Sequence, residues 1–304
     1  MKTAARNLFA VGLGAVGLGA AALCASVPAT AASFSQPGGT MGAPAGAVPP
    51  PGLYFANSAN WGVSGSSPSV ASGIEIPAFI WSSGWNILGA SYAASVAGVF
   101  VDVGTHDQNY LLGAFNPYIN PVTLSWNLGH GIFVSFGEGI YIPLKSDVVF
   151  ASGAPNTTTS GAAFEQRLSV SYIANDWILS ANSIFGLTTN DSAGVKSPDY
   201  INLDATIAHT FGKWELGVVG YGAWDIENTG LTFANGGRGE AIGIGGLVGY
   251  NFGPVNLTMQ ASHQIVTHGF TNYGKDDTRV WTTLVIPIWN PAPAAAPHPL
   301  VAKY

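Results

Sequence analysis

Hydrophobic and polar residues alternate with a period of two along much of the chain, most regularly in residues 255–266. The apolar members of that segment share one face: Leu257, Met259, Ala261 and Ile265. The polar members share the other: Asn256, Thr258, Gln260, Ser262 and Gln264. Residues 164–174, 201–211 and 214–225 repeat this alternation. Successive side chains of a strand point to opposite faces, so each segment predicts a β-strand with one apolar and one polar face.

The connections between these segments alternate in length. Short breaks that predict tight turns fall at five places: residues 83–85, 129–131, 175–176, 212–213 and 253–254. Longer polar stretches, which predict loops, fall at six: residues 64–72, 105–112, 145–162, 189–198, 227–239 and 269–277. The pattern joins about twelve strands. Short turns on one side, long loops on the other and an even strand number are typical of bacterial outer-membrane barrels.

The predicted fold is therefore an all-β, antiparallel, transmembrane up-and-down β-barrel. Lipid offers no hydrogen bonds, so the backbone of a membrane-spanning sheet must pair with itself in a closed ring. Two segments, residues 53–61 and 132–141, alternate less cleanly, and Glu138 falls in phase with Val134 and Phe136.

Composition supports a membrane protein that crosses with strands. Charged residues make up only 9% of the chain and hydrophobic residues 47%, whereas about 25% of a soluble domain is charged. Beyond the N-terminus, no apolar stretch approaches the roughly 20 residues of a membrane-spanning helix. Tryptophans near predicted strand ends fit an interfacial girdle, although ordinary packing explains them equally well: Trp61, Trp81, Trp85, Trp126, Trp177, Trp214, Trp281 and Trp289.

The first 31 residues read as a secretory signal peptide. Lys2 and Arg6 precede the apolar run 8–23, and small residues then allow cleavage after Ala31 or Ala32. The single cysteine lies in this segment, directly after a leucine too bulky for the usual lipoprotein site. The mature chain is then free of cysteine, so neither disulfides nor thiolate chemistry is expected.

Three further regions follow the signal. Residues 32–51 form an uncharged Pro/Gly-rich lead-in on the periplasmic side, residues 52–290 the outer-membrane barrel, and residues 291–304 a Pro/Ala-rich tail. The lead-in is also a candidate for partly plugging the periplasmic exit of the barrel.

The charge balance argues against nucleic acid as a partner. The chain has 10 basic and 16 acidic residues, and two of the basic ones leave with the signal, so the net charge falls from −6 to −8. We expect the partners of the mature chain to be the lipid bilayer, a small-molecule solute and the barrel-assembly machinery.

Two sequence motifs resemble a known family. "PPPGLYF" at residues 49–55 and "NPYINPVTLSWNLGHGIFVSFGEGIYIPL" at residues 116–144 resemble the outer-membrane family of Gram-negative bacteria named for the meta-pathway of phenol degradation, whose members are described as transporters. The resemblance implies an outer-membrane barrel that passes small solutes, with hydrophobic or aromatic compounds as candidates. Such barrels usually end on an aromatic residue, whereas Trp289 is followed here by the tail, so the assembly signal is either internal or at Tyr304.

Charged residues on the polar faces are the candidate site of this channel, because a basic side chain facing the bilayer centre would cost roughly 2–4 kcal/mol. The candidates for contact with a solute in the lumen are Glu165, Arg167, Asp204, Glu215, Asp225 and Gln260. A structural network that bridges the barrel interior is the alternative role for the same residues.

The other sequence motifs do not support a catalytic or ligand-binding site. The G-x-G-x-x-G of residues 12–17 lies inside the signal peptide, and residues 269–275 imitate a phosphate-binding loop that Asp276 then breaks. His263 and His268 are five residues apart, on opposite faces of a strand. We therefore expect no catalytic site, no metal and no cofactor.

Two other function classes stay open at this point. A barrel hydrolase would place its catalytic groups at the outer rim, and the candidates are His106, Asp107, His268, Asp276 and Asp277. A surface-structural barrel would use its loops to contact partners and would pass no solute.

Overall fold

The structure is a computed structural model, and it describes residues 33–65, 69–105, 108–144, 149–150, 161–192, 194, 196–229, 237–269 and 276–291. Its strands are β1 (Gly52–Ser64), β2 (Val70–Ile87), β3 (Ala90–Thr105), β4 (Gln108–Gly129), β5 (Ile132–Tyr141), β6 (Val149–Phe150), β7 (Ala163–Ala174), β8 (Trp177–Thr188), β9 (Tyr200–Phe211), β10 (Trp214–Asp225), β11 (Glu240–Asn251), β12 (Asn256–His268) and β13 (Thr278–Trp289). Among these residues, no helix is long and apolar enough to cross a membrane.

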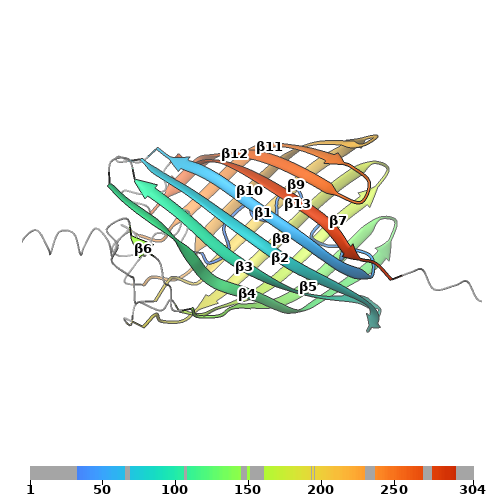
Figure 1. The fold of residues 1–304 in the computed structure, drawn as a ribbon, viewed down its shortest axis with the longest axis horizontal. Coiled ribbons are helices and arrows are strands. Elements are labelled where there is room, and N and C mark those ends of the chain that lie inside the picture. Colours follow the sequence, from blue (N-terminus) through green and yellow to red (C-terminus); the bar gives the residue numbers. More distant parts are fainter. Residues whose placement is uncertain are drawn as a thin grey trace, which may run out of the picture.

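Twelve long strands close into an antiparallel barrel (Figure 1). Each pairs with its neighbours in the chain, β5 pairs with β7, and β1 pairs with β13 to close the ring. The two-residue β6 adds only a short pairing to β4. The predicted fold class, with about twelve strands, is confirmed.

Burial alternates along the strands as the sequence predicts. On β9, Asn202 and Asp204 are 0% and 3% exposed, whereas Leu203 and Ile207 between and beyond them are 41% and 56% exposed. The polar face therefore lines the lumen, and the apolar face forms the outer surface that lipid covers. Glu138 of β5 lies half-buried on the same outward side as Phe136.

The lengths of the connections distinguish the two ends of the barrel. Tight turns occur as predicted after β4, β7, β9 and β11, with positive φ angles of 52° at His130 and 52° at Asn175. We call this rim the short-turn end and the opposite rim the long-loop end. In outer-membrane barrels they face the periplasm and the outside, respectively.

Two predicted connections are wrong. Residues 83–85 lie inside β2, where the register shifts between Ser82 and Asn86 and Gly84 adopts a φ of 75°, as in a β-bulge. The turn comes later, at Leu88 and Gly89. Residues 105–112 are not a long loop, because β3 runs to Thr105 and β4 begins at Gln108. A glycine next to a serine marks a bulge as readily as a turn, and polar residues continue a strand wherever their neighbours pair.

Aromatic side chains gather at the short-turn end. Trp177 packs against His209 at 4.7 Å between ring centroids, and Trp214 packs against Tyr250 at the same 4.7 Å. Trp85 stacks on Tyr92 at 5.6 Å. These rings form an interfacial girdle. Trp281 does not belong to it, since its side chain is 1% exposed and faces the lumen.

Candidate functional site

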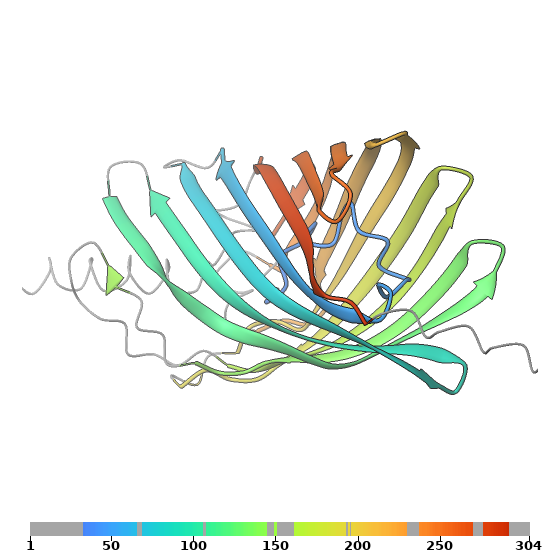
Figure 2. The ribbon, with the colours of Figure 1, turned by 45° about the vertical axis from the view of Figure 1, so that its right-hand side comes forward.

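The lumen is occupied by the chain itself. Residues 33–51, which we call the lumen segment, run inside the barrel (Figure 2, blue). At the short-turn end, the carbonyl of Pro49 accepts a hydrogen bond from the Ser82 hydroxyl at 2.8 Å. At the other end of the segment, the Ser35 hydroxyl lies 2.9 Å from that of Tyr141, the last residue of β5. The sequence predicts a periplasmic lead-in that is a candidate for partly plugging the barrel exit, and the structure places residues 33–51 inside the barrel.

Asp204 of β9 makes the most concentrated contact with the lumen segment. Its carboxylate accepts hydrogen bonds from the backbone N–H of Gly38 (2.8 Å), the backbone N–H of Thr40 (2.9 Å) and the Thr40 hydroxyl (2.7 Å). A buried carboxylate needs donors of this kind to offset its desolvation, and such charge-assisted bonds are stronger than neutral ones. Asp204 and the turn at residues 38–40 therefore fix each other.

Small hydroxyl side chains hold the middle of the segment. The Ser171 hydroxyl accepts from the Gly46 N–H at 2.8 Å, while the Ser125 hydroxyl donates to the Gly46 carbonyl at 2.7 Å. The Ser135 hydroxyl donates to the Ala45 carbonyl at 2.9 Å. The lumen wall thereby satisfies backbone groups that have no sheet partner of their own.

Gly46 is required at its position by close approach. A Cβ there would lie 2.6 Å from the Ser171 backbone nitrogen and 2.7 Å from the Phe133 carbonyl oxygen. Both neighbours are backbone atoms of the barrel wall and cannot turn away. Any larger residue would lift the segment off the wall.

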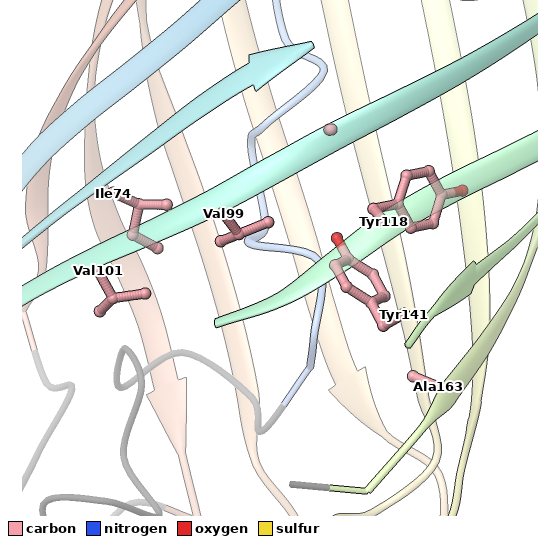
Figure 3. Close-up of a cluster of buried hydrophobic side chains, with 7 residues drawn as sticks. Ile74, Val99, Val101, Tyr118, Tyr141 and Ala163 are labelled. Carbon is pink, nitrogen blue, oxygen red and sulfur yellow. The ribbon is translucent and has the colours of Figure 1, made fainter. Parts of the chain in front are cut away.

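Two apolar side chains of the segment pack on separate patches of the wall. Met41 is 3% exposed and packs in a cluster with Val219, Tyr221 and Leu247. Phe34 packs against a second cluster, whose members Ile74, Val99, Val101, Tyr118, Tyr141 and Ala163 are drawn in Figure 3. The wall is thus polar where it binds segment backbone and apolar where it binds these two side chains.

Glu165 and Arg167 form a second polar centre near the long-loop end. Glu165 is 0% exposed and accepts from the Tyr200 hydroxyl at 2.6 Å and from the Arg167 guanidinium at 2.8 Å. The guanidinium also lies 4.6 Å from the centre of the Tyr118 ring, a cation–π contact. Glycines make room for the rings: a Cβ at Gly186 would overlap the ring of Tyr200.

The other predicted lumen residues lie apart from this centre. Gln260 donates to the Gly38 carbonyl at 3.3 Å and so also holds the lumen segment. Asp225 accepts from the Gly239 N–H at 2.8 Å at the long-loop end. Glu215 lies on the lumen face of β10 toward the short-turn end and is partly buried.

The candidate lumen residues predicted from the sequence omit one buried ion pair. Arg279 and Asp277 are each 4% exposed and lie 3.0 Å apart, and Arg279 also donates to the Ser72 hydroxyl at 2.9 Å and to Asn60. The signal was available, since Asp277, directly before β13, is in phase with Arg279 and Trp281 of that strand. The sequence places Asp277 in an exposed outer loop, which is wrong because alternation continues through it.

The candidate hydrolase residues do not come together in the described part of the chain. Asp277 is committed to Arg279, and His268, whose side chain is 71% exposed, pairs with Glu240 at 3.4 Å. Asp276 is exposed on the rim. His106 and Asp107 lie outside the described residues.

Known proteins resemble this chain in sequence family and in fold. A family model described as "Putative MetA-pathway of phenol degradation" matches residues 42–274. No curated protein matches the sequence. An outer membrane channel from Pseudomonas putida F1 is similar in structure, with a TM-score of 0.63 and 10% identity over 79% of this chain and 96% of that one. The translocator domain of the autotransporter NalP from Neisseria meningitidis aligns with a TM-score of 0.47 and 9% identity over 77% of this chain and 87% of that one. The CymD monoaromatic hydrocarbon channel aligns with a TM-score of 0.41 and 10% identity over 80% of this chain and 90% of that one.

Proposed function

Because the chain belongs to the family described as the "Putative MetA-pathway of phenol degradation", we propose that this outer-membrane barrel is a channel for small, uncharged hydrophobic solutes, including aromatic compounds. The observation that carries the solute class is the lumen segment. It fills a cross-section that a porin for polar solutes would leave to water, and its Phe34 and Met41 lie on apolar patches of the wall.

The charged lumen residues support the same solute class. Glu165 and Arg167 satisfy each other, and Asp204 is satisfied by the lumen segment. The Arg167 guanidinium also donates to the Ser35 hydroxyl of the segment at 3.4 Å. We propose that a solute passes all six sequence-predicted residues, with Arg167, Asp204 and Gln260 acting mainly by holding the segment. Glu215 and Asp225 lie outside those contacts and are the candidates for direct contact with solute. The barrel-assembly machinery remains the partner that we expect for insertion.

We propose no enzymatic activity for this barrel. A hydrolase would need an acid or base free to move a proton, and the pairing of Asp277 with Arg279 makes it a structural group. A transport assay distinguishes a channel from a surface-structural barrel, because a surface-structural barrel passes no solute.

The test is uptake by intact cells, since hydrophobic solutes cross simple liposomes unaided. Uptake of radiolabelled phenol and arabinose is measured in a porin-deficient Gram-negative host with and without the barrel. We expect several-fold faster phenol uptake with the wild-type chain and little change for arabinose. Removing residues 33–50 should raise the uptake of both. Phenol uptake that is independent of the barrel would refute the channel.

A further inference from the structure

Asn202 of β9 anchors the start of the lumen segment near the long-loop end. Its amide nitrogen donates to the Ser35 carbonyl at 2.8 Å and to the Ser33 hydroxyl at 3.3 Å. The Ser33 hydroxyl itself donates to the Ser35 carbonyl at 2.7 Å. Ser33 and Ser35 are both buried. Ser33 is therefore held inside the barrel, and its main-chain nitrogen lies within a side chain's length of the Asn202 amide.

Two buried acceptors in this region have no donor. Among the residues that the structure describes, no hydrogen bond reaches Oδ1 of Asn202 or Oε1 of Gln36. Both side chains are more than nine-tenths buried, since Asn202 is 0% and Gln36 8% exposed. Buried acceptors in native structures nearly always have a partner. Oδ1 of Asn202 belongs to the amide whose nitrogen contacts Ser33, so a donor on Ser33 is close enough to serve it.

The charges around Asn202 are unbalanced as well. Asp204, two residues further along the same face of β9, is buried, and its carboxylate accepts only from uncharged donors. Tyr200, two residues before Asn202, donates to Glu165, whose charge Arg167 balances at 2.8 Å. Two carboxylates and one guanidinium leave one negative charge. Buried charges are expected to be paired, so this part of the lumen favours a further cation.

No other strand residue of the described chain supplies that cation. Arg279, the other lumen-facing cation on a described strand, is paired with Asp277 at 3.0 Å on the wall that β1, β2 and β13 form. Asp225, which lies opposite Tyr200 in the register of β9 and β10, adds another buried carboxylate at the rim. The excess of negative charge therefore extends from Asp204 to the long-loop end.

Signal-peptide cleavage after Ala32, one of the two points that the sequence predicts, would supply both the donor and the charge. Hydrolysis of the Ala32–Ser33 peptide bond consumes one water and leaves a carboxylate on Ala32 and an ammonium on Ser33. An uncharged amide with one N–H thereby becomes a group with three donors, and α-amino groups are mostly protonated at neutral pH. We propose that the lumen wall around Asn202 is a binding site for the chain's own α-ammonium group at Ser33.

The site makes signal removal a condition for a balanced barrel interior. A chain that keeps its signal peptide has an uncharged amide at Ser33, so the negative charge of Glu165 and Asp204 stays in excess and the segment is held less firmly. Cleavage after Ala31 would move the ammonium to Ala32, one residue away from the Asn202 contacts. The site therefore selects Ser33 as the first residue of the mature chain.

The first measurements use the wild-type chain, exported in a Gram-negative host and purified from the outer membrane. Its intact mass should correspond to a chain that begins at Ser33, and a chain that begins at Ala32 or elsewhere would overturn the site. The folded barrel is then treated with an acetylating N-hydroxysuccinimide ester at pH 7, where lysine side chains stay protonated. Mass spectrometry of the N-terminal peptide should show labelling about ten-fold or more slower than in the heat-unfolded chain.

Two charge variants separate an ion-binding site from simple burial. Glu165→Gln removes one carboxylate and should accelerate labelling of the folded chain about ten-fold. Arg167→Met removes the competing cation and should label no faster than wild type. If both residues acted only by packing on the segment, both variants would loosen Ser33 and accelerate labelling. The matched control is Glu240→Gln, the same change at a partly exposed carboxylate of β11 that pairs with His268, and it should label at the wild-type rate.

Each variant is first required to show the heat-dependent gel migration of a folded barrel. The site is overturned if folded and unfolded wild type label at the same rate, or if Glu165→Gln labels no faster than wild type. It is also overturned if Arg167→Met accelerates labelling as much as Glu165→Gln does. The first residue and the wild-type protection need no variant, so they test the site even if a substitution prevents folding. None of these measurements depends on solute uptake, so they are independent of the channel proposal.

Discussion

Asp204→Asn should release the lumen segment from the barrel wall. The carboxylate receives three hydrogen bonds, two of them from the backbone N–H groups of Gly38 and Thr40. An asparagine of the same shape keeps one acceptor oxygen but turns an N–H₂ donor toward the Thr40 donors. Each hydrogen bond to a charged group contributes about 1.5–3 kcal/mol, and a buried donor left unsatisfied costs about 1–3 kcal/mol.

With one acceptor retained, the net loss in docking free energy is about 2–4 kcal/mol, which lowers the ratio of docked to undocked segment by a factor of roughly 30 to 1,000. The assay uses the predicted removal of Cys24, the single cysteine of the sequence, with the signal peptide. Ala45→Cys places one thiol on the segment, and its rate of reaction with a bulky polar maleimide reports the undocked fraction. In Asp204→Asn the rate should rise at least about ten-fold.

The matched control is Asp225→Asn, the same chemical change at a rim carboxylate that bonds Gly239 rather than the segment. Its labelling rate should stay at the wild-type value. The reasoning is refuted if Asp204→Asn labels no faster than wild type, or if both variants accelerate labelling equally.

Three further outcomes follow from the described contacts. Gly46→Val should raise single-channel conductance several-fold, because its side chain would overlap backbone atoms of the wall; an unchanged conductance would mean that the segment does not limit flow. Arg279→Met leaves Asp277 buried without its partner and should destabilise the barrel by about 3–5 kcal/mol, and adding Asp277→Asn should recover most of the loss, as seen in the temperature at which the folded gel band disappears. The hydrogen bond from Lys196 to Glu227 raises the pKa of Lys196 above its usual 10.5, so this loop tie persists through neutral pH and is lost only as the pH rises through the raised pKa. Protease cutting of the loop should accelerate there, and Lys196→Met should remove the pH dependence.

The sequence predicts the barrel wall well because lipid on one face and the lumen on the other require apolar and polar residues to alternate along each strand. Residues 201–207 and 256–262 alternate without interruption, so their strand, face and lumen side chains could all be assigned. The same rule fails where a bulge keeps a strand going past Gly84, and where polar residues near Thr105 remain in the sheet. Residues at a bulge and polar residues within a strand have the same composition as residues of a turn or loop, so composition does not separate them.

The sequence suggests only that the lumen segment could partly plug the periplasmic exit, and its path along the lumen could not be predicted. Its residues lack charge and alternation, and most of its contacts are made by backbone groups of residues such as Gly38, Ala45 and Gly46, which carry no side-chain signal. On the wall, the contacts are serines and threonines that read as ordinary polar lumen positions. Only Arg167, Asp204 and Gln260 stood out from the sequence, and their partners in the segment became visible only in three dimensions.

The lumen segment also sets the order in which the chain can reach its native contacts. Gly38 bonds residues that lie 166 and 222 positions away in the sequence, Asp204 and Gln260. Contacts of such separation form late, since the loop between them must close first. The groove that receives the segment exists only once strands from β4 to β12 lie side by side. Residues 33–51 are synthesised before every strand of the barrel and are thus among the last to become ordered. An unfinished barrel keeps an open interior until the sheet around it is complete.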